Sequence, residues 1–258
     1  MDFLSIFIAV LPVVLIGVYI YKKDKIKESK SLLLRLFLFG IFSCFPAVLF
    51  GSIIGNFFPK IENMNFFELF LYCFIAISLI EELSKWFFTY KLTYYHIEFD
   101  SLYDMIVYAV FISLGFAFLE NILYVKEYGI ATGILRGFLS VPGHACDGVL
   151  MGMYLGLSKV EYIKGKRNIS FIYKFMSILI PTLTHGIYDF CLFYGSNLFI
   201  LFFSFFVVIV DIICIKKVRE ISKYNYKFNN KKQELLIKWF LFFFYSNRMY
   251  TSAIVLSI

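Results

Sequence analysis

Long apolar segments alternate with short polar segments along most of the chain. Each apolar segment is close to the length of about 20 residues that a helix needs to cross a hydrocarbon core of about 30 Å. They lie at roughly 3–21, 32–55, 66–90, 102–124, 131–157, 171–190 and 196–215. The pattern therefore predicts seven membrane-spanning helices.

The two ends of the chain need separate interpretation. The first apolar run lacks the basic start and the small-residue cleavage site of a signal peptide, so we interpret it as a retained span. The segment 235–258 is apolar but carries Lys238 and Arg248. We favour an amphipathic helix in the membrane interface for it, with an eighth span as the alternative. The predicted fold is an all-α polytopic transmembrane bundle, with one domain at 1–215 and a basic tail at 216–258.

Composition supports this fold class. Hydrophobic residues make up 60% of the 258 residues, and the mean hydropathy is +0.78. An ordinary soluble domain has about 45–50%, and a fold of this size could not remove so much apolar surface from water. A soluble domain, a disordered chain and a small disulfide-built scaffold are therefore excluded. The five cysteines all lie in apolar runs without a CxxC pair, so we interpret them as packing residues.

The net charge of +7 has a topological explanation. Lysine and arginine gather in the loops 22–31 and 158–170 and in the stretch 216–232, whereas the intervening loops carry few. Cytoplasmic loops of membrane proteins are enriched in these residues. We therefore expect a multi-pass protein of the cell membrane with its N-terminus outside and its basic tail in the cytoplasm. No nucleic-acid partner is needed to explain the charge.

Ionisable residues inside spans are rare and tend to be functional, and here they form four groups on consecutive spans. The first group contains Glu81, Glu82 and Lys85. Glu81 and Lys85 are four residues apart, so they share a helix face and can pair. A structural ion pair would account for one glutamate but leaves the second without a cation. An unpaired carboxylate in this environment suits a general acid or base.

The second and fourth groups repeat a four-residue spacing. Phe116 and Glu120 line one face of the fourth span. His185 and Asp189 share a face of the sixth span, with Pro181 four residues before the histidine. Proline loosens a helix and frees a backbone carbonyl. These positions predict a polar site inside the membrane.

The third group surrounds His144 in the fifth span. His144 follows Pro142 by two residues, and Asp147 follows three residues later. Asp147 either orients the imidazole or pairs with a cation such as Arg136 or Lys85. Small residues at intervals of four allow another helix to approach closely. They are Gly148, Gly152 and Gly156.

The residue types narrow the chemistry. The sequence has no phosphate-binding glycine loop in a strand–helix context, no HExxH and no GxSxG. Carboxylates and imidazoles suit a water molecule activated by a carboxylate or by a metal ion. Hydrolysis of an acyl bond inside the membrane is the leading hypothesis. A proton-coupled transporter and a non-catalytic scaffold are the alternatives.

Together the four groups resemble the PrsW family of bacterial intramembrane proteases, within a superfamily that includes type II CAAX prenyl endopeptidases. The match covers roughly 66–195. The family pattern reads EExxK, FxxxE, a histidine in a glycine-rich span, and HxxxD. Here these are Glu81-Glu82-x-x-Lys85, Phe116-x-x-x-Glu120, His144 and His185-x-x-x-Asp189. The resemblance implies site-1 cleavage of a single-span membrane protein such as an anti-sigma factor during envelope stress.

The resemblance implies two mechanisms, which the sequence leaves open. In a glutamic protease, Glu81 or Glu82 is the base for water, and the histidines and Lys85 stabilise the oxyanion. In a metalloprotease, zinc is bound by His144, His185 and Glu120, and Glu81 polarises the bound water. We favour the glutamic type, which needs no cofactor, because no closely spaced ligand pair is present. The catalytic candidates are Glu81, Glu82, Lys85, Glu120, His144, His185 and Asp189.

Residue counting along each span places the four groups at different depths in the membrane. Glu81 falls near mid-membrane, whereas Glu120 and His185 fall toward the outer side. At 1.5 Å per residue the offset is about 5–10 Å. Kinks in the helices or misjudged helix ends are the two ways to account for it.

Overall fold

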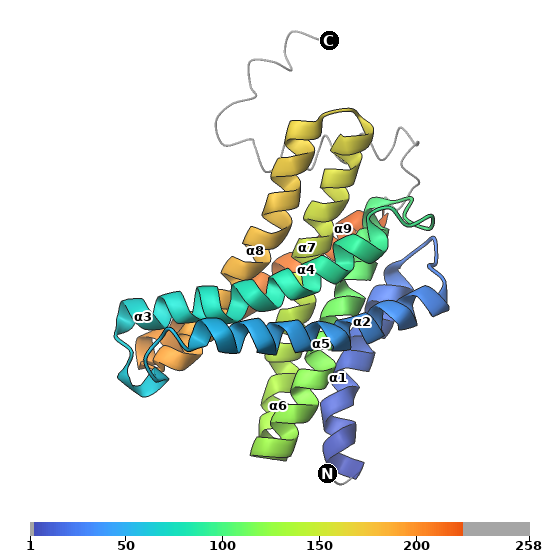
Figure 1. The fold of residues 1–258 in the computed structure, drawn as a ribbon. Helices are drawn as coiled ribbons and strands as arrows, with labels where there is room; N and C mark the ends of the chain where they lie inside the picture. The colour runs from blue at the N-terminus through green and yellow to red at the C-terminus, as the bar shows by residue number, and fades with distance from the viewer. Residues whose placement is uncertain (1–2, 224–258) are drawn as a thin grey trace.

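In the computed structural model, which describes residues 3–223, the regular structure is helical throughout (Figure 1). The predicted interfacial helix at 235–258 lies outside the described residues. The elements, in chain order, are α1 (Phe3–Lys23), α2 (Lys30–Gly55), the 3-10 turn η1 (Ile61–Asn63), α3 (Phe66–Leu71), the π-helix η2 (Tyr72–Leu79), α4 (Ile80–Thr93), α5 (Leu102–Tyr128), α6 (Ile130–Phe138), α7 (Ser140–Ile163), α8 (Arg167–Tyr194) and α9 (Asn197–Lys223).

The helices form a membrane bundle around α5. Among the described residues, five helices are long and apolar enough to cross a membrane, namely α1, α2, α5, α8 and α9. Helix α7 and the continuous segment α3–η2–α4 occupy the places of the other two predicted spans, and both are more polar because they carry ionisable groups. Helix α5 packs against α1, α2, α4, α6, α7 and α9. The helical membrane bundle is confirmed, and the count of seven spans stays a prediction.

One predicted element is divided. The apolar run 131–157 is not a single helix, because the chain turns at Leu139 between α6 and α7. Pro142 accounts for the position of this break. Proline has no amide hydrogen and fits best in the first turn of a helix, and Pro142 lies in the first turn of α7, which begins at Ser140. The prediction of one continuous span was therefore wrong.

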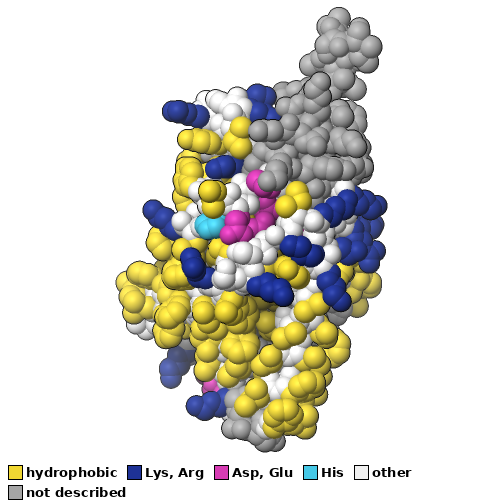
Figure 2. All heavy atoms as spheres, turned by 90° about the vertical axis from the view of Figure 1, so that its right-hand side faces the viewer, with side chains coloured by type: hydrophobic (Ala, Val, Ile, Leu, Met, Phe, Trp, Pro, Cys, Tyr) yellow, Lys and Arg dark blue, Asp and Glu magenta, His cyan; other side chains and the backbone are white. Residues whose placement is uncertain are grey.

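Alternate loops meet at the same end of the bundle. Lys25 donates to the carbonyl of Lys223 at 2.6 Å, which joins the α1–α2 loop to the end of α9. The amide of Ser29 donates to Glu98 at 2.9 Å, which joins the same loop to the α4–α5 loop. We call this the lysine-rich end. In Figure 1 this end lies at the right, whereas α3 lies at the left edge and the start of α1 at the lower end. Figure 2 shows many basic side chains at this end, beside a broad hydrophobic area.

Glycines allow α7 to lie directly against α5. A Cβ atom at Gly152 would lie 2.4 Å from the carbonyl oxygen of Met105, and one at Gly156 would lie 2.4 Å from the Leu102 side chain. Both distances are shorter than any normal contact. The prediction of a small-residue face at Gly148 and its successors is confirmed, because α5 occupies it.

Replacement of Gly152 by alanine is expected to destabilise the bundle by about 1–3 kcal/mol, as overpacking of a close contact does. The added methyl group would meet the backbone of α5, which cannot rotate away as a side chain can. Gly143→Ala on the same helix is the matched control, because its Cβ would lie 3.8 Å from the Tyr188 ring. Thermal unfolding of both variants in detergent measures the difference. Equal unfolding temperatures would contradict the close α5–α7 contact.

At the lysine-rich end, a buried carboxyl group sits between loops. Glu28, in the α1–α2 loop, forms a hydrogen bond with the hydroxyl of Tyr108. Burial raises the pKa of Glu28 well above its ordinary range, and the neighbouring carboxylates of Asp104, Asp24 and Glu98 add to the effect. The folded protein therefore holds a proton here that the unfolded chain releases.

This proton makes stability depend on pH. Since the folded pKa of Glu28 is raised, the favourable contribution is complete below about pH 4.5 and is lost as the pH rises toward the folded value. The unfolding temperature of Glu28→Gln is expected to fall less between pH 5 and pH 8 than that of the wild type. Glu98→Gln is the control. Hydrogen bonds from Ser29 lower the pKa of Glu98, so this carboxylate is ionised in both states between pH 5 and pH 8 and its replacement should leave the pH dependence in that range as in the wild type. The same pH dependence in wild type and Glu28→Gln would contradict the prediction.

Candidate active site

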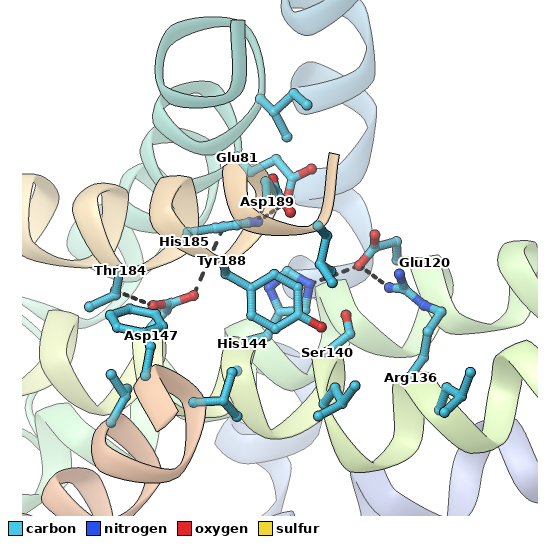
Figure 3. A pocket seen from close by; sticks show the side chains of 18 of the residues that line it. Glu81, Glu120, Arg136, Ser140, His144, Asp147, Thr184, His185, Tyr188 and Asp189 are labelled. Carbon is cyan, nitrogen blue, oxygen red and sulfur yellow. Dashed lines mark hydrogen bonds and ion pairs between the residues drawn. The ribbon is translucent and has the colours of Figure 1, made fainter. Parts of the chain in front are cut away.

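A cavity of about 440 Å³ is enclosed by η2 and α4 to α9 (Figure 3). It reaches the surface beside α6 and the end of α8, where Leu135 and Phe193 are exposed. All four predicted groups contribute polar side chains to its lining, the first through Glu81. The polar lining residues are Glu81, Glu120, Tyr124, Arg136, Ser140, His144, Asp147, Thr184, His185, Tyr188, Asp189 and Asp211.

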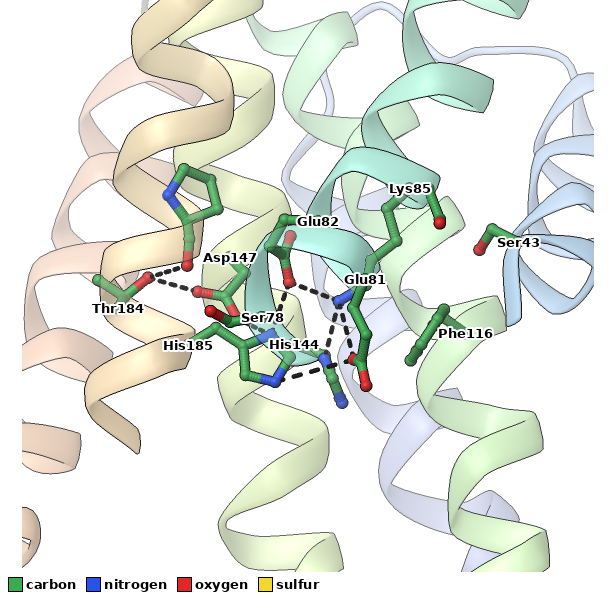
Figure 4. Close-up of polar contacts among 12 residues, drawn as sticks. Ser43, Ser78, Glu81, Glu82, Lys85, Phe116, His144, Asp147, Thr184 and His185 are labelled. Atoms are coloured by element: carbon green, nitrogen blue, oxygen red, sulfur yellow. Dashed lines mark hydrogen bonds and ion pairs between the residues drawn. The ribbon is translucent and has the colours of Figure 1, made fainter. Parts of the chain in front are cut away.

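Behind the cavity wall lies a buried ion pair (Figure 4). Lys85 Nζ lies 2.6 Å from Glu82 Oε1, and both side chains are fully buried. The same ammonium lies 3.1 Å from His144 Nδ1 and 4.0 Å from Glu81 Oε2. It also lies 4.5 Å from the centre of the Phe116 ring, an aromatic–cation contact. The EExxK and FxxxE motifs therefore meet at one ammonium group.

His185 connects this ion pair to the cavity. Its Nδ1 lies 2.8 Å from Glu82 Oε1 and 3.9 Å from Asp147 Oδ2. Its Nε2 lies 3.5 Å from Asp189 Oδ2 and 3.8 Å from Glu81 Oε2. The predicted His185–Asp189 face is thus formed, and each ring nitrogen faces carboxylate oxygens.

A second histidine is held from the other side. His144 Nε2 lies 2.8 Å from Glu120 Oε2, and the same oxygen lies 2.7 Å from Arg136 Nη2. The Arg136 guanidinium lies over the Tyr124 ring at 3.9 Å. Arg136 belongs to the short helix α6, so Glu120 on α5 links α6 to His144 on α7.

Four buried residues could hold a metal ion. One nitrogen or oxygen atom from each of Glu82, His144, Asp147 and His185 lies within 4.8 Å of the others. Two imidazoles and two carboxylates are a donor set that suits zinc. This set differs from the predicted His144, His185 and Glu120, because Glu120 faces the outer nitrogen of His144.

The surroundings of these donors fit a metal site. Glu82 Oε2 is buried and has no hydrogen-bond partner within residues 3–223. The Thr184 hydroxyl donates to Asp147 at 2.6 Å, which fixes that carboxylate. Glu120 fixes the ring of His144, and carboxylates commonly orient metal-binding histidines in this way. Lys85 is the competing cation, because its ammonium already pairs with Glu82.

The two adjacent glutamates lie in different environments. Glu81 lines the cavity and its side chain is 19% exposed, whereas Glu82 is completely buried. The π-helix η2 ends at Leu79, two residues before Glu81, and its Phe74 packs on Gly186, where a Cβ atom would lie only 2.6 Å from the ring. This contact places η2 directly against α8 beside His185. His185 Nε2 lies 3.8 Å from Glu81 Oε2, so the expected depth offset does not separate these two side chains.

Some site residues were not assigned from the sequence. The role of Asp147 was open, although its spacing from His144 was visible; the structure places it beside His185 and Thr184. Arg136 was one of the alternative partners considered for Asp147, and it pairs with Glu120 instead. Tyr188, which points into the cavity in Figure 3, carried no signal beyond its position in HxxxD.

Most of the chain is similar in sequence to the members of one protein family. Residues 28–213 match the family described as PrsW family intramembrane metalloprotease. The chain is 38% identical over 205 residues to Protease PrsW of Oceanobacillus iheyensis, covering 80% of this chain and 90% of that protein. It is 30% identical over 225 residues to Protease PrsW of Clostridioides difficile, covering 85% of this chain and 92% of that protein. No solved structure matches the chain.

The outer partner of His144 is expected to strengthen metal binding. Glu120→Ala should lower zinc affinity about 10–100-fold, because the carboxylate orients the His144 ring and loss of such a partner has effects of this size. Competition with a chromophoric chelator measures the affinity. Glu127→Ala, at an exposed position of the same helix, is the matched control. Unchanged zinc affinity in Glu120→Ala would contradict the role of Glu120.

Proposed function

Because the chain belongs to the PrsW family of intramembrane proteases, we propose that it is an endopeptidase that cleaves a single-span membrane protein such as an anti-sigma factor. Family membership indicates a peptidase, which favours this hypothesis over a transporter or a scaffold. The observation that carries the proposal is the convergence of all four motif groups on one cavity and the buried cluster behind it.

The position of the cavity supports a cut on the outer side. Its exposed lining residues lie near α6 and the end of α8, away from the lysine-rich end. If the lysine-rich end faces the cytoplasm, as the distribution of basic residues predicts, the cavity opens toward the outer half of the bilayer. A substrate helix that enters beside α6 would present its outer segment to Glu81. This orientation agrees with the site-1 cleavage that the resemblance implies.

We propose the metallo type of mechanism, with Glu82, His144, Asp147 and His185 as the residues that hold a zinc ion. The buried donor set and the family description support this choice. A zinc ion bound there would supply Lewis-acid polarisation of water and of the scissile carbonyl. Thr184 and Glu120 keep Asp147 and His144 in position.

Glu81 is the proposed general base and acid. Its Oε2 has no hydrogen-bond partner within residues 3–223, and the carboxylate lines the cavity where a substrate bond would lie. Glu81 takes a proton from the attacking water and returns it to the leaving amine. His185 and Lys85, at 3.8 Å and 4.0 Å, hold the carboxylate in place. Arg136 lines the same cavity and offers positive charge to the developing oxyanion.

One observation favours the glutamic type as a second candidate. The Lys85 ammonium already balances the Glu82 carboxylate at 2.6 Å. The buried group therefore has a resident cation of its own, and Glu81 could activate water beside it without a metal ion.

The deciding experiment combines metal analysis with cleavage of a single-span test substrate in proteoliposomes. Purified full-length protein is expected to carry about one zinc ion, and removal by a chelator should abolish cleavage until zinc is restored. Glu81→Gln should retain zinc but lose cleavage by about 100-fold or more, because it cannot accept a proton. His185→Ala should lose both zinc and cleavage.

Glu127→Gln, an exposed position outside the cavity, is the matched control and should behave as the wild type. Full activity after complete demetallation, together with an inactive Glu81→Gln, would overturn the metallo type and leave the glutamic type. Full cleavage by both Glu81→Gln and His185→Ala would overturn the proposed protease site itself.

A further inference from the structure

A second concave site lies on the opposite side of α5 from the cavity. It is a groove of about 500 Å³ between α1, α2 and α5, and it shares no lining residue with the cavity of the proposed active site. All of its lining is apolar apart from Gly17, Tyr21 and Lys30. The lining residues are Val10, Val13, Val14, Gly17, Val18, Tyr21, Lys30, Leu33, Leu34, Phe37, Phe111, Leu114 and Phe118.

The groove runs from the lysine-rich end toward the middle of the bundle. Along α1 its lining extends from Tyr21 to Val10, which at 1.5 Å per residue is about 16 Å. Half of a hydrocarbon core of about 30 Å is about 15 Å. The groove therefore has the length of one acyl chain in a single leaflet.

Its floor is open because of a glycine. A Cβ atom at Gly17 would lie 3.5 Å from Leu114 Cδ1, an ordinary contact. Larger side chains at this position would extend into the groove. The absence of a side chain at Gly17 thus leaves space for a flexible hydrocarbon chain.

The charged end of the groove points to an anionic headgroup. Lys30 is exposed at the first turn of α2, and no carboxylate within residues 3–223 forms an ion pair with it. Lys27 lies 4.6 Å over the Tyr21 ring, which lines the same end. An uncompensated ammonium above an apolar slot is complementary to a phosphate above an acyl chain.

We propose that the α1–α2–α5 groove is a binding site for an anionic phospholipid, with one acyl chain along α1 and the phosphate at Lys30. The site is independent of the proposed protease activity.

The test is native mass spectrometry of the full-length protein in detergent with equal amounts of phosphatidylglycerol and phosphatidylcholine of identical acyl chains. The wild type should retain one phosphatidylglycerol molecule in preference to phosphatidylcholine. Lys30→Gln should lose about fivefold of that preference, the effect of one lysine near an anionic lipid. Lys91→Gln, an exposed lysine at the same end that does not line the groove, is the matched control and should keep it.

Two further variants fill the groove from different positions. Gly17→Leu and Val14→Phe should each reduce retention of both lipids, and the unfolding temperature shows whether each variant is folded. Equal retention of the two lipids by the wild type, an unchanged preference in Lys30→Gln, or full retention in folded groove-filling variants would overturn the proposal. Crosslinking of a single-span peptide to the groove without any lipid preference would also overturn it.

Discussion

The ammonium of Lys85 has to be balanced inside an apolar bundle, and this requirement arranges the helices of the candidate site. A charge removed from water is tolerated only when it is paired and hydrogen-bonded. Lys85 meets Glu82 at 2.6 Å and His144 at 3.1 Å, and Glu82 in turn meets His185 at 2.8 Å. These contacts connect α4, α7 and α8. Displacement of any of these helices would leave a buried charge uncompensated, so the relative positions of the three helices are fixed by electrostatics as well as by packing.

Irregular backbone brings the remaining groups to this cluster. In lipid, helices are broken only where the freed backbone groups are buried in protein or line a cavity. Both irregular segments here satisfy that condition. The π-helix η2 ends two residues before Glu81, and the break at Leu139 separates α7 from the short helix that carries Arg136. Each irregularity therefore has a positional consequence for a side chain of the site.

The hydrophobic pattern was sufficient to predict most of the helices. A long apolar run in lipid must hydrogen-bond all of its backbone N–H and C=O groups internally, and a helix does this within one segment. The motif spacing was sufficient to predict which ionisable residues share a helix face. Spacing along one helix does not fix its rotation against its neighbours, which is why Asp147 rather than Glu120 faces the buried group. The π-helix could not be predicted, since Tyr72–Leu79 is an ordinary apolar stretch. The break at Leu139 had a visible cause in Pro142, but the apolar run around it concealed the boundary.

The double glutamate has a geometric explanation. Adjacent residues on a helix point about 100° apart, so the carboxylates of Glu81 and Glu82 face different surroundings. Glu82 faces the buried cluster, where Lys85 and His185 surround it, and Glu81 faces the cavity. Lys85 lies three residues from one and four from the other, so a single ammonium reaches both carboxylates. A single glutamate at either position would provide either a fully buried carboxylate or one that lines the cavity. The pair provides both on one helical turn, which accounts for the compact form of the EExxK sequence.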